Sequence, residues 1–121
     1  MASPSFGSFI PGAEPYWYQG FPSPYYSSEH VAFRAKCREF VERELVPHVD
    51  EWVARKEYPQ ELHRKLFEAG ISGIIYPKRL GGSAPEKKDY FLELIRVDEF
   101  SRTGGHVLGQ EVRSFFGPLL V

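Results

Sequence analysis

From residue 28 to residue 52, hydrophobic residues recur at intervals of three and four, the period of one helix face. Ser28 is a suitable cap for such a helix, and Glu29 favours its positive end. Pro47 interrupts the pattern, but Val49 and Trp52 continue it. We therefore expect either a kinked helix or a second short one. Before Pro47, the apolar positions of this face are Phe33, Cys37, Phe40, Val41 and Leu45.

Three further helices follow from the same kind of pattern. One opens at Pro59, a residue favoured at a first helical position, and stops at Gly70, with Leu62, Leu66 and Ala69 on its apolar face. Another covers about residues 88 to 102, with Tyr90, Phe91, Leu94, Ile95 and Val97 as its apolar positions. The last opens near His106. Its apolar face consists of Leu108, Val112, Phe115, Phe116 and Leu119. No stretch alternates with a period of two, so the predicted fold class is all-α.

The first 28 residues have a different composition. They contain one charged residue, Glu14, with five of the ten prolines and eight of the nineteen aromatic residues. Proline at this density opposes helix formation, and the aromatic side chains favour packing on a surface. We expect residues 1–27 to form an extended arm on their own domain or a neighbour, and residues 28–121 to form the helical domain. The chain ends on the apolar run "FFGPLLV", so we expect it to be truncated within a longer protein.

Composition excludes several functions. The net charge is −1 and the basic residues are dispersed, which argues against a nucleic-acid partner. No apolar stretch approaches the roughly 18 residues that span a membrane. The one cysteine, Cys37, lies on a predicted apolar face, where we expect a buried and inert thiol.

Motif chemistry is sparse. Of the four histidines no two stand four residues apart, so we expect no metal site. No serine lies in a G-x-S-x-G turn. The segment "RLGGSAP" lacks the spacing of a phosphate-binding loop, and we interpret Gly81 and Gly82 as a turn that the backbone requires.

Four segments, in this order, resemble the N-terminal helical domain of the acyl-CoA dehydrogenases over residues 28 to about 120. They are a helix ending of the family's E-x-P type, with one more residue between Glu44 and Pro47 here (residues 44–47), a P-x-E-L helix start (59–62), a crossing with paired glycines (70–82) and a helix end of the E-E-L-(A/S)-R type (98–102). In that family the crossing passes through the domain core, which implies that Ile71, Ile74 and Ile75 are core residues.

The resemblance implies a three-part enzyme with a β-domain and a C-terminal helical domain beyond this one, assembled as a homo-oligomer. Such an enzyme uses FAD to oxidise the α–β bond of an acyl-CoA, with a glutamate removing the α-proton. That base and most flavin contacts belong to the later domains, so we expect no catalytic residue here and little flavin bound by this segment alone. The family occurs in the mitochondrial matrix or the cytoplasm, and no presequence is visible.

By position, the helix near residue 106 would border the acyl cavity. The residues implied to line the substrate pocket are His106, Val107, Gln110 and Glu111. The alternative is that Val107 is a plain core residue and the other three are solvated.

Two other functions remain open at this point. Acyl-CoA oxidases and flavin monooxygenases share this domain and differ in how the reduced flavin is reoxidised. A stand-alone helical interaction module would instead use the aromatic arm and the apolar chain end as partner surfaces.

Overall fold

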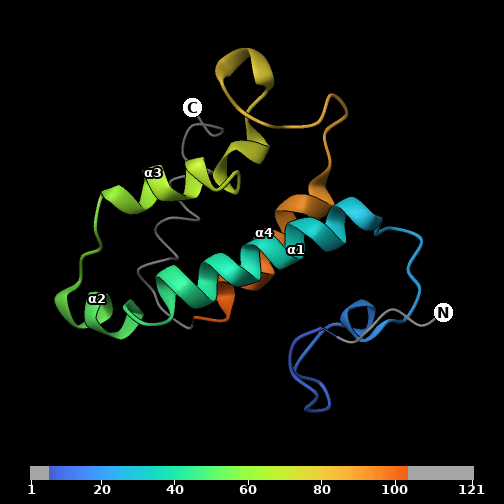
Figure 1. The fold of residues 1–121 in the computed structure, drawn as a ribbon, viewed down its shortest axis with the longest axis horizontal. Coiled ribbons are helices and arrows are strands. Elements are labelled where there is room, and N and C mark those ends of the chain that lie inside the picture. The colour runs from blue at the N-terminus through green and yellow to red at the C-terminus, as the bar shows by residue number, and fades with distance from the viewer. Residues whose placement is uncertain (1–5, 104–121) are drawn as a thin grey trace.

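The computed structural model describes residues 6–103, and Figure 1 shows their arrangement. This part of the chain is helical and contains no strand, which confirms the all-α prediction. The α-helices are α1 (Ser28–Phe40), α2 (Val49–Arg55), α3 (Glu61–Glu68) and α4 (Tyr90–Ser101). Short helical turns join them: η1 (Tyr16–Gln19), η2 (Val41–Leu45), η3 (Ser72–Ile75) and η4 (Lys78–Leu80). None of the helices in residues 6–103 is long and apolar enough to cross a membrane.

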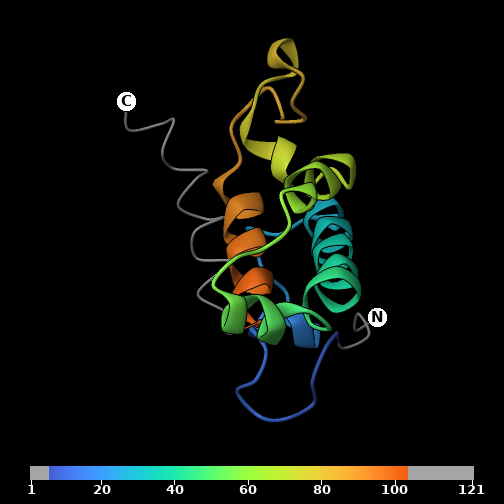
Figure 2. The ribbon, with the colours of Figure 1, turned by 90° about the vertical axis from the view of Figure 1, so that its left-hand side faces the viewer.

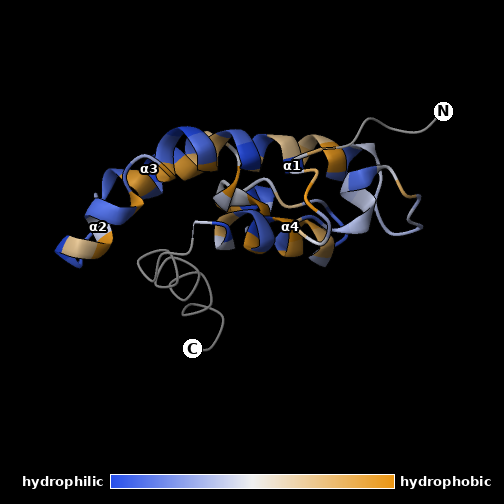
Figure 3. Ribbon diagram, turned by 90° about the horizontal axis from the view of Figure 1, so that it is seen from below, coloured by the Kyte–Doolittle hydropathy of each residue, from blue (hydrophilic) through white to orange (hydrophobic). Residues whose placement is uncertain are grey.

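The core lies between α1 and α4, which run side by side in both Figure 1 and Figure 2. Each helix has a hydrophobic and a hydrophilic side, as the colouring in Figure 3 shows. The apolar face predicted for the first helix, which covers α1 and η2, is buried as expected, with Cys37 of α1 and Leu45 of η2 fully enclosed. The core cluster consists of Phe33, Cys37, Phe40, Val41, Leu45, Val49, Leu62, Leu66, Ile71, Ile95 and Phe100.

Pro47 produces a second short helix rather than a kink. The turn before it, η2, is a π-helix in which the amide of Val46 donates to the carbonyl of Val41 (2.9 Å). A π-turn holds one more residue than an α-turn, so Val41, Leu45 and Val49 all remain buried across the break. The apolar face therefore stays turned towards the core on both sides of Pro47.

Three helix starts differ from the sequence prediction by one or two residues. Ser27, not Ser28, is the N-cap of α1. Regular helix in α3 begins at Glu61 because Pro59 forms a preceding turn, its carbonyl accepting from the Leu62 amide (3.0 Å). Asp89 caps α4 by accepting the amide of Phe91 (2.9 Å), so α4 opens at Tyr90.

The crossing after α3 behaves largely as predicted. Gly70 ends the helix with a positive φ of 72°, and Ile71 is fully buried beneath it. Ile74 and Ile75, predicted as core, are only partly buried, although Ile74 packs against the core cluster. The reason is that η3 turns the chain outward towards the loop that follows.

That loop, residues 76–89, projects beyond the helices, as Figures 1 and 2 show. It is tied at its base by the amide of Ala84, which donates to the carbonyl of Tyr76 (3.0 Å). Gly81 has a φ of 84°, and a Cβ on Gly82 would overlap the Tyr76 carbonyl. Both glycines are therefore required by the backbone, as the sequence predicted.

The described part of the N-terminal arm packs on its own domain. It contains the 3₁₀ turn η1, so it is not extended throughout. Tyr18 is 1% exposed, and Trp17 stacks on Tyr26 with ring centroids 4.0 Å apart. The guanidinium of Arg34, from α1, lies 4.1 Å from the Phe6 ring centroid and 4.6 Å from that of Trp17. The arm therefore binds through aromatic and cation–π contacts.

Candidate functional site

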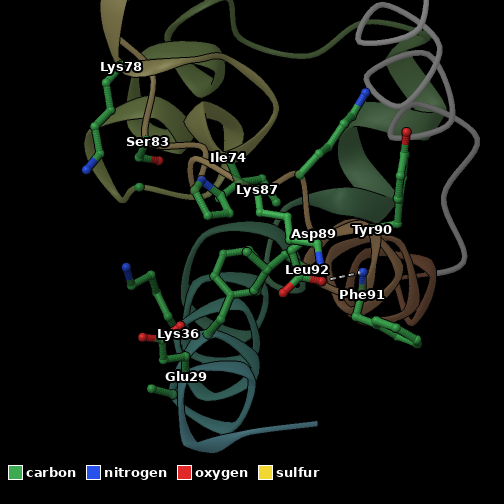
Figure 4. Close-up of a pocket in the computed structure, with 15 residues that line it drawn as sticks. Glu29, Lys36, Ile74, Lys78, Ser83, Lys87, Asp89, Tyr90, Phe91 and Leu92 are labelled. Atoms are coloured by element: carbon green, nitrogen blue, oxygen red, sulfur yellow. Dashed lines mark hydrogen bonds between the residues drawn. The ribbon is translucent and has the colours of Figure 1, made fainter. Parts of the chain in front are cut away.

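A groove of about 880 Å³ opens where α1, the η3 turn, the loop of residues 76–89 and the start of α4 meet. Figure 4 shows the side chains that line it. Its apolar lining includes Phe33 from α1, Ile74 from η3 and Leu92 from α4. Four lysines also line it: Lys36, Lys78, Lys87 and Lys88. The volume is within the range of roughly 300–1,000 Å³ that small-molecule sites occupy.

The lysines reach the groove from separate elements. Lys36 comes from α1, and its ammonium lies beside Gly70, close to the negative end of α3. Lys78 opens η4, and Lys87 and Lys88 precede the cap of α4. The ammonium of Lys88 also lies 5.0 Å from the ring centroid of Tyr90, which is 69% exposed. The groove therefore combines an apolar lining with positive charge.

A serine, a histidine and an aspartate meet where α1 and α4 begin. His30 Nε2 lies 2.8 Å from Asp89 Oδ2, and His30 Nδ1 lies 3.0 Å from Ser27 Oγ. The backbone amide of Ser27 also donates to Nδ1 (2.9 Å), so the lone pair that a general base would use is already engaged. These contacts form a capping arrangement that joins the two helix starts, and we assign them a structural role.

A second polar cluster lies at the other end of the α1–α4 pair. Glu99 of α4, whose side chain is fully buried, accepts from Arg38 Nε of α1 (2.6 Å) and lies near Arg102 Nε (3.5 Å). Glu14 of the arm is contacted by Arg38 (3.3 Å) and, more closely, by Arg102. The hydroxyl of Tyr18 donates a short hydrogen bond to Glu99. The cluster thus joins the arm to both helices.

The protonation states in this cluster favour a structural role. Burial opposes ionisation of Glu14, but the Ser8 amide and the charges of Arg38 and Arg102 outweigh it and lower the pKa of Glu14. Burial and the hydrogen bond to Glu99 raise the pKa of Tyr18 far above its usual value of 10.0. A carboxylate held ionised and a phenol held neutral cannot exchange a proton readily near neutral pH.

Neither a reactive thiol nor a metal-ligand cluster is found among residues 6–103. Burial raises the pKa of the Cys37 thiol to about 12, so the thiolate is scarce, and the side chain is fully enclosed. No group of three His, Cys, Asp or Glu side chains in this part of the chain is placed to hold a metal ion.

The residues expected to border an acyl cavity, His106, Val107, Gln110 and Glu111, lie outside the described residues, as does the whole helix predicted near residue 106. The structure instead reveals features that sequence patterns missed. The groove lysines come from separate segments, and Glu99 and Arg96 are buried although charged residues on helices are usually solvated. One signal was available for Glu14, because a single charge within an aromatic and proline-rich arm requires a partner.

Residues 27–119 match the family model described as "Acyl-CoA dehydrogenase, N-terminal domain". Acyl-CoA dehydrogenase apdG of Emericella nidulans is 32% identical over 110 residues, covering 80% of this chain and 25% of that protein. Acyl-CoA dehydrogenase AFT10-1 of Alternaria alternata is also 32% identical over 110 residues, covering 82% of this chain and 26% of that protein. No solved structure matches.

A third relative is the Caffeyl-CoA reductase-Etf complex subunit CarC of Acetobacterium woodii. It is 37% identical over 82 residues, covering 67% of this chain and 21% of that protein. The chain thus spans about a quarter of the length of these relatives.

Proposed function

The chain belongs to the acyl-CoA dehydrogenase family, as its N-terminal domain, and from this membership we propose that it serves a flavoprotein that oxidises the α–β bond of acyl-CoA thioesters. The match of the N-terminal domain model over residues 27–119 carries the proposal. In it, the helical domain forms one wall of the acyl and flavin site and supports the assembly. The reaction itself belongs to domains outside these 121 residues.

The described residues support this division of labour. Glu14 and Glu99, two buried carboxylates of this part of the chain, are engaged by Arg38 and Arg102, so neither is free to act as the proton-abstracting base. The proposal assigns FAD and the proton-abstracting glutamate to the later domains. FAD, when bound there, would supply the hydride acceptor. The 121 residues alone are then expected to be inactive.

The test compares the 121-residue chain with the longer protein of which it is proposed to be a part. The longer protein should show a bound-flavin absorption spectrum and reduce a dye when an acyl-CoA is added. The 121-residue chain should do neither, although its circular dichroism should show folded helix. Substrate-dependent dye reduction by the 121 residues alone would refute the proposal.

The electron acceptor is a separate part of the proposal. One relative, CarC of Acetobacterium woodii, is named as a subunit of an Etf complex, which favours a protein acceptor over oxygen. In the longer protein, substrate oxidation without oxygen consumption and with reduction of an electron-transfer protein would support this choice. Oxygen consumption that matches substrate turnover would instead indicate an oxidase or a monooxygenase with the same domain.

A further inference from the structure

Positive charge without a carboxylate partner is concentrated at the groove. Within residues 6–103, Lys36, Lys78 and Lys87 have no acidic group within ion-pair distance, and Lys88 contacts only the ring of Tyr90. Most cations elsewhere in residues 6–103 are paired with carboxylates. The cations paired with carboxylates include Arg38, Arg43, Arg55, Arg64, Lys65, Arg96 and Arg102. Lys56 and Arg79 also have no ion pair within residues 6–103, but they lie outside the groove lining, whereas four lysines meet at this one hollow.

Two acidic residues line the groove with the four lysines, so they offset only part of its positive charge. Asp89 is occupied by His30 Nε2 (2.8 Å) and by the amide of Phe91 (2.9 Å). Glu29 lies in the first turn of α1, where the positive helix end favours a negative charge. The groove therefore retains an excess of positive charge that an anion would compensate.

The apolar part of the groove restricts which anion fits. Phe33 is buried, and Ile74 and Leu92 pack against the core cluster beside it, so they form a fixed apolar surface. A small inorganic anion would leave this surface in water, and a neutral hydrocarbon would leave the lysines unpaired. A ligand with a linear apolar chain and one anionic end satisfies both.

We propose that the groove is a binding site for a free single-chain carboxylate of medium length, with its chain on Phe33, Ile74 and Leu92. Its carboxylate is bound among the ammonium groups of Lys36, Lys78 and Lys87. The proposal is independent of the enzymatic activity proposed above, because it concerns residues on the groove surface and a ligand that is not a thioester.

The test is a calorimetric titration of the folded 121-residue chain with decanoate, kept below its aggregation threshold, and with decanol and butyrate as comparison ligands. Decanoate should bind most tightly, because decanol lacks the charge and butyrate lacks the chain. The double variant Lys78→Gln/Lys87→Gln should bind decanoate about 5- to 30-fold more weakly, as expected for the loss of two partly exposed ion pairs. It should leave decanol binding unchanged.

Lys56→Gln is the matched control, since Lys56 is an exposed lysine outside the groove, at the end of α2. It should bind decanoate like the unmodified chain. Binding should also weaken with added salt. Equal binding of decanoate and decanol, no binding of decanoate, or an unchanged affinity in the double variant would each overturn the proposal.

Discussion

Replacing Glu99 by glutamine tests whether the buried charge cluster holds the domain together. The substitution preserves the shape of a side chain that is fully buried and removes only its charge. It leaves Arg38 without the carboxylate 2.6 Å from its Nε, and it deprives Tyr18 of a charged acceptor. Arg38 would then keep only Glu14, and Arg102 would keep Glu14 and the more exposed Asp98.

The expected loss of unfolding free energy depends on which ion pairs remain in the variant. Removing one partner of a buried ion pair typically costs 3–5 kcal/mol of unfolding free energy, because the other charge stays buried and uncompensated. Glu14 still lies 3.3 Å from Arg38, so we expect the lower end of that range, about 3 kcal/mol. For a domain of this size, that loss corresponds to a fall of roughly 9–18 °C in Tm.

The neighbouring residue provides the control. Asp98 is 43% exposed at its side chain, lies 3.4 Å from Arg102 and accepts a long hydrogen bond from Tyr18 (3.3 Å). The neutral variant Asp98→Asn keeps an acceptor oxygen for Tyr18 and should cost no more than about 0.5 kcal/mol. The assay is urea unfolding followed by circular dichroism at pH 7, with the same slope required for all variants. Tyr18→Phe provides a milder change in the same cluster, with an expected loss of about 1.5–2 kcal/mol.

A loss of unfolding free energy in Glu99→Gln no larger than that in Asp98→Asn would refute a stabilising role for the buried cluster. A Tyr18→Phe variant as stable as the unmodified chain would refute it as well. If Glu99→Gln proves too unstable to purify, the Tyr18→Phe measurement still decides, because its expected loss is within the stability of an ordinary domain.

Three further predictions concern the arm, the thiol and the loop. Because the pKa of Glu14 is lowered on folding, its contribution to the free energy of unfolding is complete above its ordinary pKa of 4.5 and is lost as the pH falls through the lowered value. Urea unfolding should show the difference in unfolding free energy between the unmodified chain and Glu14→Gln shrinking over that pH range. Cys37 should resist a thiol reagent in the folded chain at pH 8 and react at least about 100-fold faster in concentrated urea, and similar rates in both would contradict its burial. Gly82→Ala should destabilise the domain by about 2 kcal/mol or more, against about 1 kcal/mol for Gly81→Ala, which is strained but not crowded; the reverse order would contradict the loop geometry.

The sequence predicted what depends on periodicity. Neighbouring residues determine an apolar helix face or a positive φ. The sequence therefore predicted the face of α1, the helix end at Gly70 and the glycine turn. Helix starts were displaced by one or two residues because Ser27, Pro59 and Asp89 form caps and turns that compete with the helix itself.

Contacts between distant segments were not predictable in the same way. The groove lysines are brought together by the path of the chain, and no local pattern marks them. Arg34 is buried under three aromatic rings of the arm, and Arg96 is 2% exposed on α4, although charged residues on a helix are ordinarily read as solvated. Tertiary contacts decide these cases, and one sequence shows only which residues are available for them.

The link between Glu14 and Arg102 has a consequence for how the chain is made. These residues are 88 positions apart, so at synthesis rates of about 5–20 residues per second the arm would emerge roughly 4–18 s before its last partner. During that interval Phe6, Trp17 and Tyr18 have no complete surface to bind. The arm can contact Arg34 and Arg38 of α1 earlier, but its docking is complete only after the end of α4 has left the ribosome, and until then it stays open to chaperones or to pairing with another nascent copy.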